Sequence, residues 1–160
     1  PIVTLISGGK SNNYIFDNVA LVNLSKMIDN IVNINSISLV ILFSRRTDFF
    51  IKEYLINRYS EIHTVWTDES NNPYLTLLSQ SSCLICTSDS VSMISEAVCS
   101  KKPVFIFRLK SKKKSNRIEI FNEKLLQLGY TKELSTKLTF DKTNYVNETL
   151  SIAEKILSKD

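Results

Sequence analysis

A chain of 160 residues, 43% hydrophobic and 22% charged, has the size and composition of one globular domain with a sizeable core. No apolar run is long enough to span a membrane, and nothing at the start resembles a signal peptide. The three cysteines are an odd number, which argues against a disulfide framework. Cys83 and Cys86 stand three residues apart in a strand pattern and therefore point to opposite faces. We expect a reduced, cytoplasmic protein without a metal site or a cofactor.

The net charge of +4 is mildly basic, and much of it sits in one run from Lys110 to Arg117. We expect this run to form an exposed loop. Such a loop suits docking to a protein partner or to anionic lipid headgroups, as a peripheral membrane contact. A merely solvated loop has the same pattern. Because no aromatic residue interleaves with the charges, we expect no nucleic-acid binding.

Apolar and amphipathic segments alternate about five times along the chain. The expected strands cover residues 3–6, 37–43, 62–66, 83–87 and 104–107. Helices are expected over 17–33, 49–59 and 118–128. Two more are expected to begin at 72–73 and directly after 88–90. A last helix is expected near the end of the chain, with an apolar stripe over 146–157. The segment 131–143 is expected to be irregular. This alternation predicts the α/β class, a Rossmann-like parallel sheet of about five strands with helices on both faces and strand order 3-2-1-4-5.

The stretch from 83 to 107 contains the clearest candidate site. A buried strand ends in a polar turn of three residues, Ser88, Asp89 and Ser90. The following helix has an apolar side and a nearly opposite side that carries Asp89, Ser92 and Glu96. Its N-terminus follows the end of a strand, where open α/β sheets bind ligands, and its dipole suits an anion such as phosphate. The same turn is also an ordinary N-cap, and the polar side is also an ordinary solvated face.

Two other predicted strands end in residues that suit an anion. The first strand is followed by Gly8, Gly9 and Lys10, where glycine lets the backbone approach a ligand, although a plain tight turn explains the pair equally. The second strand ends at Arg45 and Arg46, whose guanidinium groups can bind an anion by forked hydrogen bonds or simply be solvated. Because parallel strands end at one edge of a sheet, we expect these turns to converge with the turn at 88–90.

Several segments together resemble a known family: SGGKSNNYIFD (7–17), SRRT (44–47), NPYLTLLSQSSCLICTSDSVSMISEA (72–97) and KPVFIF (102–107). They are similar to the mitochondrial-fission "elongated mitochondria" family, over nearly the whole chain up to Gly129. Bacterial members carry the label nucleoside-diphosphate-sugar epimerase. That label gains no support here, because the NAD fingerprint and a Tyr-x-x-x-Lys pair are both missing. In that family these segments form the C-terminal half, so the resemblance implies that an N-terminal domain is missing.

The family in turn resembles GT-B glycosyltransferases, whose C-terminal domain holds a nucleotide sugar. The resemblance implies that Gly8 and Gly9 face the diphosphate, that Ser90 and Ser92 offer phosphate the helix start, and that Glu96 takes the ribose hydroxyls. Asp89 departs from those relatives, because a carboxylate repels a diphosphate unless a cation compensates it.

Two functions follow as hypotheses. The first is the nucleoside-diphosphate-sugar-binding domain of a GT-B-like glycosyltransferase, inactive as an isolated chain. The alternative is a non-catalytic adaptor that recruits a protein partner, as the resemblance to the fission family implies.

Overall fold

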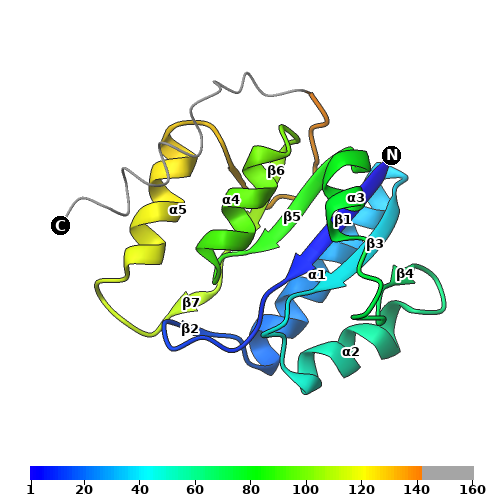
Figure 1. The fold of residues 1–160 in the computed structure, drawn as a ribbon, viewed down its shortest axis with the longest axis horizontal. Helices are drawn as coiled ribbons and strands as arrows, with labels where there is room; N and C mark the ends of the chain where they lie inside the picture. The colour runs from blue at the N-terminus through cyan, green and yellow to red at the C-terminus, as the bar shows by residue number, and fades with distance from the viewer. Residues whose placement is uncertain (142–160) are drawn as a thin grey trace.

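The computed structural model describes residues 1–141, and its centre is a parallel sheet of six strands (Figure 1). The strands are β1 (Ile2–Ser7), β3 (Ser38–Phe43), β4 (Thr64–Val65), β5 (Cys83–Thr87), β6 (Val104–Phe107) and β8 (Lys132–Glu133). Their spatial order is β4-β3-β1-β5-β6-β8, and every neighbouring pair is parallel. The five predicted strands correspond to β1, β3, β4, β5 and β6, and their spatial order confirms the predicted order 3-2-1-4-5. The sixth, β8, falls in the segment that the sequence predicts to be irregular.

Within residues 1–141, five helices cover the two faces of this sheet: α1 (Asn18–Asn35), α2 (Phe49–Tyr59), α3 (Tyr74–Gln80), α4 (Val91–Cys99) and α5 (Arg117–Gln127). The predicted cap of the first helix is confirmed, because the Asp17 carboxylate accepts a hydrogen bond from the Ala20 N–H at 3.0 Å. No helix within residues 1–141 is both long enough and apolar enough to cross a membrane. The helix predicted over 146–157 lies outside the described residues.

Alternating strand residues build a separate core on each face of the sheet. On one face Leu5, Ile41 and Ile85 pack with α1 and α2. On the other face Ile6, Leu84 and Ile106 pack with α3, α4 and α5. The central strands are therefore apolar on both sides, which is the pattern of a doubly covered parallel sheet.

The cysteines of the C-x-x-C pattern fall on opposite faces, as predicted. Cys83 belongs to the core under α1 and α2, whereas Cys86 belongs to the core under α4. Both are free and fully buried. Burial raises the pKa of the Cys83 thiol to about 12 and raises the pKa of Cys86 as well, so both side chains act as small apolar residues.

A second, two-stranded sheet joins the loops that follow β1 and β6. It pairs β2 (Tyr14–Ile15) with β7 (Lys110–Ser111) in antiparallel register. The prediction of a loop over the whole of 110–117 is therefore wrong at both ends: the run begins as a strand, and Arg117 is the first residue of α5. This β2–β7 ribbon lies at the corner of the molecule where α5 begins (Figure 1).

The ribbon is anchored to α5 by charged groups. The Tyr14 hydroxyl donates to the Glu119 carboxylate at 2.8 Å. The guanidinium of Arg108, just before β7, forms ion pairs with three carboxylates, those of Glu119, Glu123 and Glu133. One cation thus links β6 to both α5 and β8.

Candidate functional site

Three turns meet at the carboxyl edge of the sheet, as the sequence predicts. They follow β1, β3 and β5, and backbone hydrogen bonds tie them together. The Gly8 N–H donates to Thr87 Oγ1 at 2.7 Å, and the Lys10 N–H donates to the Arg46 carbonyl at 3.0 Å. The Gly9 N–H donates to Asp89 Oδ2 at 3.1 Å. The candidate residues are therefore neighbours in space, although they come from three separate parts of the chain.

The two glycines allow the turns to pack this closely. A Cβ atom added to Gly8 would lie 2.0 Å from Asp89 Oδ2, and one added to Gly9 would lie 1.9 Å from the Arg46 carbonyl oxygen. No real Cβ contact is that short. At Gly9 the contact is with backbone atoms, so any other residue forces the turns apart, whereas at Gly8 the Asp89 side chain would have to move. Because the N–H groups of Gly8, Gly9 and Lys10 all have acceptors inside the protein, this conformation does not direct them at a ligand.

Asp89, the residue that fits the resemblance least, has a role within the protein. Its side chain is only 7% exposed. Besides the bond from Gly9, its other oxygen accepts the Thr87 hydroxyl at 2.6 Å. Burial raises the pKa of this carboxyl group, while these two hydrogen bonds and the charge of Arg46 act in the opposite direction. Asp89 therefore accepts a hydrogen bond from the glycine turn. Keeping its carboxylate charged in a buried position costs free energy.

This cost predicts a pH-dependent effect of Asp89→Asn. Because the pKa of Asp89 is raised in the folded chain, its contribution to stability is fully present below the unfolded value of about 3.9 and is lost as pH rises through the folded value. The amide can still accept from Gly9 and donate to Thr87. We therefore expect the variant to gain about 1 kcal/mol in free energy of unfolding relative to the wild type between pH 4 and pH 7.

Urea denaturation of both proteins at several pH values measures this difference. Asp48→Asn is the matched control, because Asp48 lies at the same edge without a capping hydrogen bond from its side chain. A wild-type-to-variant difference that stays constant from pH 4 to pH 7 would contradict the raised pKa of Asp89.

The start of α4, unlike the glycine turn, has backbone N–H groups that are available to an anion. Ser90 caps the helix by accepting from the Met93 N–H at 3.4 Å, and Ser92 is exposed in the first turn. The first N–H groups of a helix have no partner within it, and the helix dipole adds positive potential there. Ser88 differs, because it is fully buried and its hydroxyl accepts from the Leu109 N–H at 2.9 Å. Ser88 therefore anchors the chain after β6.

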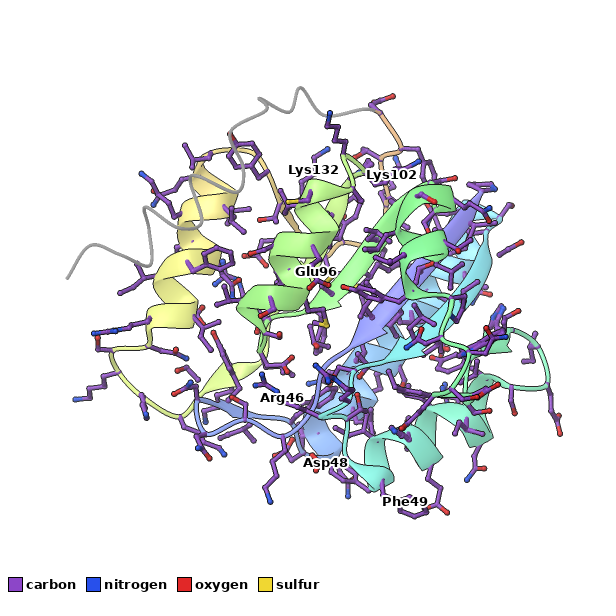
Figure 2. The ribbon with its side chains drawn as sticks, viewed as in Figure 1. Arg46, Asp48, Phe49, Glu96, Lys102 and Lys132 are labelled. Atoms are coloured by element: carbon purple, nitrogen blue, oxygen red, sulfur yellow. The ribbon has the colours of Figure 1, made fainter. Side chains whose placement is uncertain are left out.

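Glu96 lies on the side of α4 that faces α3 (Figure 2). The Tyr74 side chain, at the start of α3, lies near this carboxylate, and the pKa of Tyr74 is raised by burial first and by Glu96 second. Glu96 itself stays exposed. A neutral phenol therefore lies beside a solvent-accessible carboxylate in the second turn of α4.

Two cavities open along this edge. One, of about 610 Å³, lies between α2 and the segment before α3, with Phe43, Phe49, Trp66 and Tyr74 among its walls. The other, of about 730 Å³, is polar and includes Lys10, Arg45, Arg46, Asp48 and Asp89. Both cavities have Arg45 and Phe49 among their walls, so they are adjacent at the start of α2. Figure 2 shows Arg46, Asp48 and Phe49 grouped there.

The aromatic walls of the first cavity were not among the residues that the sequence singled out. Phe49 and Trp66 look like ordinary members of a helix and a strand, since periodicity reports burial and does not report which side chains border a cavity. Phe49 is in fact 76% exposed, although it begins an amphipathic helix. The N-P-Y-L segment around Tyr74 was the available signal. No group of three or more potential metal ligands occurs among residues 1–141.

The sequence of the whole chain identifies its family. Residues 1–159 match the family model described as mitochondrial fission ELM1. The chain belongs to this family. This ELM1-family chain is also 31% identical over 160 residues to the uncharacterized protein RP120 of Rickettsia prowazekii (strain Madrid E). That alignment covers 95% of the chain and 45% of the relative, so the chain spans about half the length of the curated protein it matches.

A solved structure has the same fold. The crystal structure of Methanocaldococcus jannaschii UDP-GlcNAc 2-epimerase, in complex with UDP-GlcNAc and UDP, is similar with a TM-score of 0.58 at 18% identity. The match covers 99% of the ELM1-family chain and 39% of the epimerase. At this identity the likeness concerns the fold, and it confirms the predicted Rossmann-like domain of the GT-B type.

Proposed function

We propose that this chain binds a nucleoside-diphosphate sugar, as the nucleotide half of a GT-B-like glycosyltransferase. The observation that carries the proposal is the order of features along one sheet edge. An aromatic-walled cavity includes Tyr74, Tyr74 lies near Glu96, and Glu96 lies on the helix whose first N–H groups have no partner within the helix. These features suit a base, a ribose and a diphosphate in that order.

Each part of the ligand has a matching chemistry in the proposal. The flat base enters the cavity between Phe49 and Trp66, where apolar and aromatic surface is available. The Glu96 carboxylate accepts hydrogen bonds from the vicinal ribose hydroxyls. The diphosphate binds at Ser90 and Ser92, at the start of α4. Lys10, Arg45 and Arg46 supply compensating positive charge from the polar cavity (Lys10, Arg45 and Arg46 are all exposed).

The reaction would be transfer of the sugar to an acceptor. The acceptor oxygen forms a bond to the anomeric carbon, the bond from that carbon to the diphosphate oxygen breaks, and the acceptor proton passes to a general base. Helix N–H groups and the two arginines stabilise the charge that develops on the leaving diphosphate. The acceptor site and the base are expected in the other half of the longer protein, so this chain alone should bind without turnover.

Isothermal titration calorimetry with UDP-, GDP-, CMP- and ADP-sugars tests the proposal. The protein used should comprise both halves, because GT-B-like sites lie between two domains. We expect micromolar to millimolar binding of at least one nucleotide sugar. If none of the four nucleotide sugars gives a binding signal at millimolar concentration, the transferase is ruled out.

The adaptor remains the second candidate because of one specific observation. The N–H groups of Gly8, Gly9 and Lys10, which the resemblance assigns to a diphosphate, all have acceptors within the chain. Under this alternative the same polar edge contacts a protein partner. The calorimetric panel separates the two functions, since an adaptor binds none of the four nucleotide sugars.

A further inference from the structure

The β2–β7 ribbon and the turn after it carry the most concentrated uncompensated charge among the described residues. Four lysines, Lys110, Lys112, Lys113 and Lys114, are exposed within five positions. None of them forms an ion pair with another described residue. The nearest acidic residues on α5, Glu119 and Glu123, are paired with Arg108. The corner therefore has a positive potential that the rest of the described chain does not neutralise.

This basic segment has a defined backbone. The Lys112 N–H donates to the Asn13 carbonyl at 2.8 Å, and its ammonium group donates to the Ser11 carbonyl at 2.9 Å. The Ser111 hydroxyl donates to the Lys113 carbonyl at 2.9 Å and accepts from the amide of buried Asn116 at 3.2 Å. A segment held in this way loses little conformational entropy when it binds.

An exposed aliphatic side chain adjoins the lysines. Ile120, on the outer side of α5, is 58% exposed. It lines, together with Lys114 and Lys124, a groove of about 490 Å³, whose other walls include Glu119 and Glu123, both paired with Arg108. Lysines beside an exposed aliphatic group match the boundary of an anionic bilayer, where headgroups carry the charge and acyl chains begin just below. A nucleic-acid surface would instead call for exposed aromatic residues for stacking, and the run from 110 to 117 has none.

We propose that the ribbon corner, Lys110 to Lys114 with Ile120, docks the protein on a bilayer that contains anionic phospholipid. The ribbon continues directly from the glycine turn through Ser11 and Asn13, which also line the polar cavity. Docking at this corner therefore brings the carboxyl edge of the sheet close to the lipid surface. The proposal does not depend on nucleotide binding.

Vesicle sedimentation with the 160-residue chain tests this docking. The vesicles contain phosphatidylcholine alone or with 30% phosphatidylserine, at roughly 50 mM and 300 mM salt. We expect binding only to the phosphatidylserine vesicles and weaker binding at the higher salt. The variant Lys113→Gln/Lys114→Gln should lose at least tenfold in partition coefficient, since each lysine near such a surface contributes roughly fivefold. Ile120→Ser should lose several-fold while keeping the salt dependence.

The matched control is Lys26→Gln/Lys137→Gln, which removes the same charge from exposed positions on other parts of the chain. Equal losses in the two double variants would mean that overall charge attracts the protein, and this would overturn the proposal. No binding to phosphatidylserine vesicles, or equal binding to pure phosphatidylcholine, would overturn it as well. A chain that ignores vesicles but binds an acidic polypeptide or RNA through Lys113 and Lys114 would assign the corner to a different partner.

Discussion

Replacing Gly9 with alanine is expected to destabilise the fold by about 3 kcal/mol, the largest effect we predict for a single methyl group in this protein. The added Cβ would meet the Arg46 carbonyl oxygen at 1.9 Å and the Thr47 Cα at 2.4 Å. Both are backbone atoms, so no rotamer change relieves the contact. The turn after β1 would have to separate from the turn after β3 and break the bond from Lys10 to Arg46. Urea denaturation of the wild type and the variant measures the loss.

Gly8→Ala provides the matched comparison, because its added methyl group meets a side chain instead. The nearest atoms are the carboxylate oxygens of Asp89, at 2.0 and 2.3 Å. Removing that side chain should therefore rescue Gly8→Ala, and the double variant Gly8→Ala/Asp89→Ala should be more stable than the sum of the single effects predicts by about 1–3 kcal/mol. Gly9→Ala should gain no such rescue from Asp89→Ala. If Gly9→Ala unfolds at the wild-type urea concentration, the three turns do not pack as described.

The order of the main strands could be predicted because it depends on local patterns. Apolar runs such as 37–43 and 83–87 mark strands that are buried on both faces, and the alternation with helices makes the sheet parallel. The short strands β2, β7 and β8 were not predictable in the same way. Lys132 and Glu133 are charged and show no alternation, and they become a strand only because β6 has a free edge for them to pair with. Pairing of Lys110–Ser111 with Tyr14–Ile15 likewise depends on a partner almost a hundred residues away.

The candidate site divides in the same manner. The convergence of 8–10, 45–46 and 88–90 follows from topology, because parallel strands end at one edge. The topology does not determine which acceptor each backbone N–H group is hydrogen-bonded to. Asp89 accepts from Gly9 only because the glycine turn lies within reach of β5, and Ser88 is taken out of the site by the chain after β6. Sequence patterns placed these residues together and could not distinguish the ones that support the turns from the ones left exposed.

Glu96→Ala is expected to weaken nucleotide-sugar binding by about 1–3 kcal/mol, if the proposed function holds. The carboxylate is exposed and lies in the second turn of α4, so its removal deprives the ribose hydroxyls of a charged acceptor without leaving a buried group unpaired. Folding should therefore be unaffected, which thermal denaturation checks. Calorimetry with the nucleotide sugar that binds most tightly measures the loss. Glu61→Ala removes another exposed carboxylate, just after α2, and should leave affinity unchanged.

Tyr74→Phe tests whether the Tyr74 hydroxyl affects binding by orienting the Glu96 carboxylate, while the charge of Glu96 is kept. The variant keeps the ring that borders the aromatic cavity and removes only the hydroxyl, which lies near Glu96. We expect a smaller loss of affinity than in Glu96→Ala, and almost no further loss when the two changes are combined, because the hydroxyl acts through the carboxylate. Additive losses would mean that Tyr74 contacts the ligand itself. Binding that persists unchanged in Glu96→Ala would move the ribose away from α4 while leaving nucleotide binding by the domain intact.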